Sequence, residues 1–301
     1  MSNFRSFLKT QTILFMFVLT TTNAWSDEAV VYMTKGITPE ALISVFKSLN
    51  VIPQGKIAVK ISTGEPGSNY LRPELIGDFI RSLGNATIVE CNTIYGSSRL
   101  STAMHMQVAE DHGFTAIAPV DIMDADGNMS LPVISGKNMK ENIVGKHFKN
   151  YDYFVVLSHF KGHTMAGFGG AIKNSSIGIA SARGKGRIHG SNFLEAMAEA
   201  NKSVADALKC HILYINVMNR LSLDCDCESD PREPDMHDIG ILASLDPVAL
   251  DQACVDLIYK ASDGKAFVRQ IERLNGSRTL QHGEKIGLGS RIYKLIDIDK
   301  I

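Results

Sequence analysis

Two histidines and a lysine alternate directly after a buried, strand-like segment. Residues 151–158 (YDYFVVLS) form an apolar run that is typical of a buried strand, and His159, Lys161 and His163 follow at every second position. If the extended conformation continues, all three side chains point to one face, because side chains in a strand repeat every two residues. Imidazoles and an amine can move protons and bind anions, and open α/β sheets bind ligands at the carboxyl ends of their strands.

The same segment continues through several glycines to Lys173. Glycines allow the backbone to approach a ligand closely, although such a run is often only a turn, and a single histidine here is usually structural. Because so many of these residues lie within the sixteen positions from 159 to 174, we interpret the segment as a site. The candidate catalytic residues are His159, Lys161, His163 and Lys173, and the candidate cofactor-binding glycines are Gly169 and Gly170.

A second group of cations lies a few residues further on. Arg183, Lys185 and Arg187 alternate with glycines, and His189 follows. Such a loop suits phosphate or carboxylate, with a solvated basic loop as the alternative. We therefore add Arg183 and His189 to the candidate cofactor-binding residues. Neither the P-loop pattern nor the dinucleotide-binding glycine pattern occurs, so an ordinary nicotinamide enzyme is not indicated.

Two cysteines separated by one residue lie between carboxylates in the segment DCDCE (224–228). Cys225 and Cys227 can bind a thiophilic metal such as nickel, iron or zinc, and we predict them as metal ligands. Three alternatives stay open: disulfides to other cysteines, a reversible bridge between the two, or neither. The four-cysteine pattern of a ferredoxin cluster is absent, and the cofactor is not identified. The other cysteines are Cys91, Cys210 and Cys254.

The first 24 residues are typical of a secretory signal. Arg5 and Lys9 precede the apolar run ILFMFVL (13–19), and Ala24 offers a cleavage position. Seven apolar residues are too few for a bilayer span, which needs about twenty, so no stable span is expected after cleavage. An uncleaved anchor is the alternative. We predict a periplasmic or secreted protein, with a mature domain at residues 25–301 and a formal net charge that changes from −1 to −3.

Composition is that of an ordinary globular protein. Of the 301 residues, 45% are hydrophobic and 21% are charged, and no basic stripe with interleaved aromatics occurs. Nucleic acid is therefore not an expected partner. The cationic segments described above instead favour a small anionic ligand. The oligomeric state is not determined by these features.

The elements that position these residues alternate between strands and helices. Strands are predicted at 29–33, 56–61, 86–90 and 151–158, and helices at 39–49, 102–111, 193–208 and 247–259. Pro247 opens the last helix and Asp246 caps it. This alternation predicts an α/β fold in which a mostly parallel sheet, or two such sheets, is covered by helices. The chain forms either one unit or two lobes that divide near residues 140–150.

Six motifs are spread over nearly the whole mature chain: YLRPEL (70–75), HFKGH (159–163), GFGGAIKN (167–174), DCDC (224–227), ILASLDPVALD (241–251) and HGEKIGLGS (282–290). On these motifs the chain is identified as similar to domain of unknown function family 362. Many relatives carry a ferredoxin-type insert with two iron–sulfur clusters. This chain lacks the insert, so the resemblance implies no electron transfer through such clusters.

The chain also remotely resembles the nickel-pincer lactate racemase family. In that family a histidine, a glycine pair followed by a lysine, and a later histidine occur in the same order. The lysine tethers a nickel-pincer nucleotide, one histidine ligates nickel, and histidines shuttle the substrate proton. In this chain the candidates for the second acid–base histidine are His105 and His159. The matching positions here are His163, Gly169, Gly170, Lys173 and His189.

Two function classes are therefore expected. The first is an enzyme with a metal- or cofactor-dependent site that acts on a small anionic substrate, by proton transfer next to a carboxylate or by redox chemistry at a hydroxy acid. The second is a binding protein that holds an anion or a metal in the same cationic pocket without turnover.

Overall fold

The computed structural model describes residues 28–134, 136–209, 211–231 and 233–300. The predicted signal at 1–24 and Cys210 lie outside the described residues. None of the described helices is long and apolar enough to cross a bilayer.

An eight-stranded sheet runs through the molecule in the order β12-β1-β11-β10-β7-β2-β3-β4. β11 is antiparallel to both of its neighbours, and the other described neighbouring pairs of this sheet are parallel. The mostly parallel sheet predicted from the sequence is thus confirmed. Its strands are β1 (Ala29–Thr34), β2 (Ile57–Lys60), β3 (Ala86–Glu90), β4 (Val120–Ile122), β7 (Tyr153–His159), β10 (Ile212–Met218), β11 (Gly240–Ser244) and β12 (Tyr293–Asp297).

Two short hairpins complete the strands. β5 (Asn128–Pro132) pairs with β6 (Glu141–Gly145), and β8 (Lys161–His163) pairs with β9 (Gly167–Gly169). Residues 140–150, where a lobe boundary was expected, include β6 and a short 3₁₀ helix, and strands from before and after them join the one large sheet.

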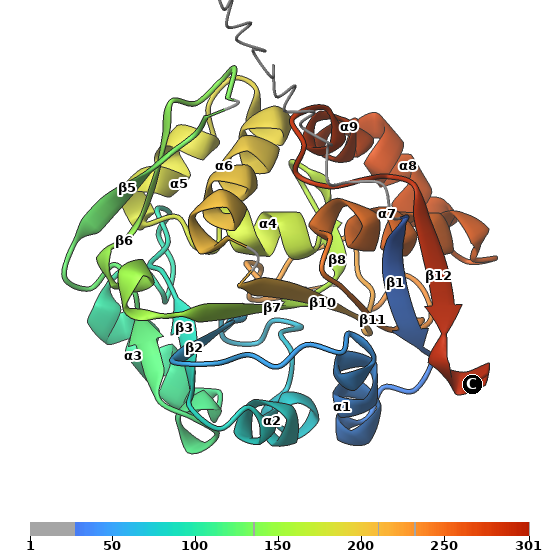
Figure 1. The fold of residues 1–301 in the computed structure, drawn as a ribbon, viewed down its shortest axis with the longest axis horizontal. Helices are drawn as coiled ribbons and strands as arrows, with labels where there is room; N and C mark the ends of the chain where they lie inside the picture. The colour runs from blue at the N-terminus through green and yellow to red at the C-terminus, as the bar shows by residue number, and fades with distance from the viewer. Residues whose placement is uncertain (1–27, 135, 210, 232, 301) are drawn as a thin grey trace, which may run out of the picture.

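Helices cover both faces of the sheet (Figure 1). α1 and α2 lie on one face, and α4, α6 and α7 lie on the other. The helices are α1 (Pro39–Ser48), α2 (Pro73–Ser82), α3 (Thr102–Asp111), α4 (Ala171–Ser176), α5 (Ala182–Ile188), α6 (Phe193–Leu208), α7 (Pro247–Lys260), α8 (Lys265–Arg273) and α9 (Ser277–Lys285), with short 3₁₀ helices at Phe114–Ala116, Lys146–Asn150 and Ile298–Lys300.

β7 shows why the sequence folds in this way. Every residue of β7 is buried, as expected for a strand that is covered on both faces. Phe154 and Val156 pack in one hydrophobic cluster with residues of α4 and α7, and Val155 packs in a second cluster with residues of α1 and α2. The two-residue repeat of the strand therefore supplies both layers of the core.

α7 begins as its sequence predicts. The Asp246 carboxylate accepts hydrogen bonds from the backbone N–H groups of Val248 and Ala249, at 2.8 and 2.9 Å, and Pro247 occupies the first turn.

Candidate active site

A cavity of about 120 Å³ lies at the carboxyl ends of β2, β3 and β7. The last residues of these strands, Lys60, Glu90 and His159, all line it. From β2 the chain builds the sheet outward through β3 and β4, and on the other side of β2 it builds outward through β7 and β10. The cavity thus lies where the strand order changes direction, which is the usual ligand position in open α/β sheets.

Two buried carboxylates in the cavity wall are already neutralised by cations. Glu90 lies 2.8 Å from the Lys60 ammonium and 3.7 Å from the Arg99 guanidinium, and Arg99 also lies 2.7 Å from Glu65. Burial by itself raises the pKa of the Glu90 carboxyl, but the neighbouring positive charges, of which Lys60 contributes most, together outweigh it, and the pKa lies at about 2. Glu90 is therefore ionised at neutral pH. It neutralises positive charge of Lys60 and Arg99 that could otherwise bind an anionic ligand.

Asp226 forms the second neutralised centre. It accepts from the Lys161 ammonium, and its carboxylate lies 2.9 Å from Nδ1 of His159. Nε2 of His159 lies 2.7 Å from the carbonyl oxygen of Asn219. Both nitrogens of His159 thus already have partners, so His159 and Lys161 hold Asp226 in place.

Lys173 and Lys185 are the two cavity lysines that have no carboxylate within ion-pair distance among the described residues. The Lys185 ammonium donates to the carbonyl oxygens of Ala180 and Cys91, at 2.7 and 3.3 Å. Burial, reinforced by the charge of Lys161, lowers the pKa of Lys173 to about 7. Gly169 makes room for Lys173, because a Cβ at position 169 would lie 3.0 Å from Cδ of the lysine. The cavity therefore presents positive charge that the wall does not compensate.

Two neutral histidines lie beside these lysines. Nδ1 of His163 accepts hydrogen bonds from the backbone N–H groups of Met165 and Ala166, at 3.2 and 3.0 Å, so its proton lies on Nε2. Nδ1 of His189 donates to the carbonyl oxygen of Lys185 at 2.7 Å, which leaves a lone pair on Nε2. Both rings stack against Phe193, at centroid distances of 6.3 and 4.9 Å.

The charge state of both histidines follows from the same surroundings. Burial lowers the pKa of His163 well below its ordinary value, and the charge of Lys173 acts in the same direction. Burial lowers the pKa of His189 too, and neighbouring lysine charges add to the effect. At neutral pH the cavity therefore holds one imidazole that donates from Nε2 and one that accepts at Nε2.

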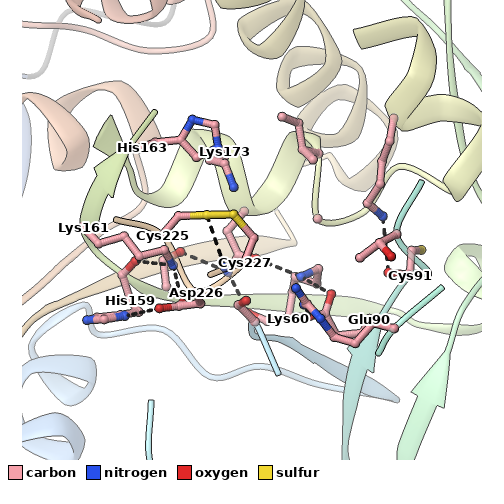
Figure 2. A pocket seen from close by; sticks show the side chains of 18 of the residues that line it. Lys60, Glu90, Cys91, His159, Lys161, His163, Lys173, Cys225, Asp226 and Cys227 are labelled. Carbon is pink, nitrogen blue, oxygen red and sulfur yellow. Dashed lines mark hydrogen bonds and ion pairs between the residues drawn. A yellow bond between two sulfur atoms is a disulfide. The ribbon is translucent and has the colours of Figure 1, made fainter. Parts of the chain in front are cut away.

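Cys225 and Cys227 are joined by a disulfide that lies below Lys173 and next to Asp226 (Figure 2). A bridge between these two cysteines was among the pairings that the sequence left open. A bonded pair offers no thiolate to a metal, and no cluster of three potential metal ligands occurs among the described residues. Metal binding by Cys225 and Cys227 thus stays a prediction for the reduced state.

The structure brings together most of the residues that the sequence singled out. His159, Lys161, His163, Gly170, Lys173, His189, Cys225 and Cys227 all line the cavity. Gly169 lies directly behind Lys173.

Arg183 is placed differently from our expectation. The segment expected as a positive loop is the helix α5, and Arg183 is exposed on it and does not line the cavity. Lys185 is buried and reaches the cavity instead. Residues two apart face different sides of a helix, so the alternating cations separate into an inner one and outer ones.

Gly170 has a structural role in addition to its place in the cavity wall. A Cβ at position 170 would lie 2.3 Å from Oδ1 of Asp251. The Asp251 carboxylate accepts from the backbone N–H groups of Ala171 and Ile172, at 2.8 and 3.0 Å. The first N–H groups of α4 are therefore bound within the protein, and the glycine allows this close packing.

Sequence reasoning missed the residues that neutralise each other. Lys60 and Glu90 each stand at the carboxyl end of an apolar strand, and Asp226 stands between the two cysteines. The sequence did contain one signal for them: a charged residue at the end of a buried strand, because a buried charge needs a partner of opposite charge. The partners come from distant segments, and sequence spacing does not show them.

Comparison with solved structures finds distant likenesses. The lactate racemase apoprotein from Thermoanaerobacterium thermosaccharolyticum is 16% identical, with a TM-score of 0.41 over 63% of this chain and 50% of that chain. A crystal structure of a Thermotoga maritima protein is 11% identical, with a TM-score of 0.39 over 83% of this chain and 60% of that chain. The chain thus spans about half the length of the first protein and three-fifths of the second.

The comparison with curated proteins gives no match. The family model of a domain of unknown function, DUF362, matches residues 57–256, which include every strand end and loop that forms the cavity. The chain belongs to the DUF362 family.

Proposed function

We propose that this protein is an enzyme that binds a small carboxylate in the cavity at the end of β2, β3 and β7 and acts on it by proton transfer. The observation that carries the proposal is the pair of lysines, Lys173 and Lys185, that no carboxylate of the described wall neutralises. Buried positive charge without a partner is costly, and an anionic ligand removes that cost.

The two histidines supply the proton chemistry. Nε2 of His189 carries a lone pair on a neutral imidazole and can accept a proton from the carbon next to a carboxylate. The Nε2–H group of His163 can donate a hydrogen bond to an oxygen of the same substrate. Lys173 and Lys185 hold the carboxylate and stabilise the negative charge that develops as the proton leaves.

The remote similarity to nickel-pincer lactate racemases raises the question of whether the cavity takes that cofactor. Lys173 is an amine with a pKa of about 7, and His189 has a lone pair on Nε2, so these groups have suitable chemistry. A cavity of about 120 Å³ is well below the roughly 300–1,000 Å³ of pockets that hold larger ligands, and the disulfide occupies the space below Lys173. The residues as arranged do not fit a nucleotide, and we route no step through one.

Exchange of the substrate hydrogen for deuterium tests the proposal. Small 2-hydroxy acids such as lactate and malate are incubated in D₂O, and loss of the signal from the hydrogen on carbon 2 is followed by proton NMR. We expect exchange in the wild type and a loss of about 100-fold or more in His189→Gln, which removes the base. Arg183→Met is the matched control, because Arg183 lies on the same helix as Lys185 but is exposed. Equal exchange in wild type and His189→Gln would contradict the proposal.

The second candidate function is a binding protein without turnover, and the small, strongly cationic cavity supports it as well. In that case the same acids raise the melting temperature of the wild type but not of Lys173→Met, and no deuterium enters any substrate. Both functions therefore predict that the acids bind, and only the first predicts deuterium exchange.

We also propose that the protein is exported. The charged and apolar pattern of residues 5–24, which is typical of a secretory signal, supports this proposal.

A further inference from the structure

The Cys225–Cys227 disulfide contributes little as a structural cross-link. It joins residues only two positions apart, and a disulfide stabilises a fold mainly by closing a long loop in the unfolded chain. Stabilisation of the fold therefore does not explain why two cysteines occur at these positions.

The loop that carries the disulfide is held by other contacts. The carbonyl oxygen of Asp226 accepts a hydrogen bond from the backbone N–H of Glu65 at 2.9 Å, and its carboxylate binds Lys161 and His159. The backbone N–H of Leu223 donates to Asp235 at 2.7 Å. Opening the disulfide therefore leaves the loop held at Leu223 and at Asp226.

The two sulfur atoms are not equivalent. Cys225 is buried, and its Sγ accepts a hydrogen bond from the backbone N–H of Cys227 at 3.2 Å. Cys227 is half-buried and lines the cavity, so it is the sulfur that an incoming thiolate reaches more easily. A thiolate left on Cys225 keeps the backbone hydrogen bond, and Figure 2 shows the Lys173 amine pointing toward the disulfide, so its positive charge lies near the pair.

The other described cysteines differ from this pair. Cys91 and Cys254 are fully buried free thiols, and the Sγ of Cys91 lies 3.3 Å from the carbonyl oxygen of Ile179. Burial raises the pKa of Cys91 to about 12, so it stays protonated. Among the described cysteines, only Cys225 and Cys227 form a disulfide that a thiolate can reach from the cavity.

We propose that Cys225–Cys227 is a two-electron redox site that an external dithiol reduces. The thiolate of the dithiol attacks Sγ of Cys227, which forms a mixed disulfide and releases Cys225 as a thiolate in the cavity that Lys173 also lines. The second thiol of the reductant then displaces Cys227. The reductant leaves as its disulfide, and the site gains two electrons and two protons. This inference does not depend on the proposed carboxylate chemistry.

Equilibration with dithiothreitol tests the inference. The folded protein is incubated with mixtures of reduced and oxidised dithiothreitol, and free thiols are alkylated and located by mass spectrometry. Circular dichroism on the same samples reports the fold. We expect the two cysteines to gain alkyl groups together while Cys91 and Cys254 stay protected and the fold persists. A pair that becomes reactive only when the protein unfolds would overturn the proposal.

Variants of Lys173 test the role of its charge. Without the ammonium the thiolate is less stable, so Lys173→Met should shift the equilibrium toward the disulfide by about tenfold, equal to roughly 30 mV for a two-electron couple. Lys173→Arg keeps the charge and should retain most of the wild-type equilibrium. Arg183→Met removes an exposed charge outside the cavity and is the control. Identical equilibria in Lys173→Met and the wild type would overturn the assignment to Lys173.

Discussion

At the scale of single residues, Lys173 decides how the cavity responds to pH. Its pKa of about 7 lies far below the ordinary value of 10.5, because the loss of water around the ammonium and the charge of Lys161 both disfavour the protonated form. The group is therefore half protonated near neutral pH. As a cation it holds an anion, and as a neutral amine it no longer does, so anion affinity is expected to fall as pH rises through 7.

The same shift predicts how stability depends on pH. Between about pH 7 and 10.5 the unfolded chain carries a proton on Lys173 that the folded protein lacks, so the contribution of Lys173 to stability rises with pH across this window. We expect the free energy of unfolding of Lys173→Met to exceed that of the wild type most at pH 6, and the gap to narrow toward pH 10. Urea titrations across this range measure it. Lys149→Met, at an exposed position, is the control. A gap that does not change with pH would show that Lys173 has an ordinary pKa.

The sulfur atoms of Cys225 and Cys227 give a second prediction at this scale. Because they are bonded to each other, we expect nickel, iron and zinc to be well below one equivalent in protein purified without chelator or reductant. Plasma mass spectrometry measures the metals. One equivalent of metal that disappears in Cys225→Ser would show that the thiols are ligands, as the sequence pattern predicts, and that the disulfide is not their resting state.

At the scale of secondary structure, α4 matters most, because this short helix carries Lys173. It is oriented by Asp251 of α7, which accepts from Ala171 and Ile172 of α4 and from the side chain of Asn216 at 2.7 Å. Three buried donors thus bind one carboxylate.

Removing that carboxylate should loosen α4. Asp251→Ala leaves the two backbone N–H groups unsatisfied and leaves the Asn216 amide only Cys254 Sγ as an acceptor, at 3.4 Å. Each buried unsatisfied donor costs about 1–3 kcal/mol, so we expect the free energy of unfolding to fall by about 3 kcal/mol or more. Asp251→Asn keeps one acceptor oxygen and should cost less. Denaturant unfolding of the three proteins gives the values. If the alanine and asparagine variants were equally stable, the hydrogen bonds to Asp251 would not be what holds α4.

At the scale of the whole molecule, the sheet brings residues from distant parts of the chain together at the carboxyl ends of its strands. The cavity combines the ends of β2, β3 and β7 with the loop at 224–228. The export that we propose would place this domain outside the cytoplasm, where disulfides persist.

Export is tested with the full-length chain. In a bacterial host with a periplasm, we expect the protein in the periplasmic fraction with Trp25 as its first residue, by mass spectrometry of the intact protein. Replacement of Leu14 and Phe15 by aspartate should interrupt the apolar run and retain the precursor in the cytoplasm, because the apolar run is what a signal needs. An intact N-terminus in the periplasmic fraction would instead indicate the uncleaved anchor.

The sequence by itself determined the α/β class, the buried strand that it predicts at 151–158 and that the structure has as β7, and most of the candidate residues that line the cavity. These are local properties: apolar runs, the two-residue repeat of a strand, and glycines with cations close together in one segment. The placement of His163 and Lys173 in one cavity follows from the short distance between them along the chain.

The tertiary structure decided which charges remain for a ligand. Lys161 and His159 bind Asp226, more than sixty residues away, and Lys60 binds Glu90 on the neighbouring strand, so those side chains are neutralised. Arg183 points outward because its segment is helical, and Lys185 points inward for the same reason. Ion pairing and burial depend on distances between segments that are remote in sequence, and spacing along one chain does not encode those distances directly.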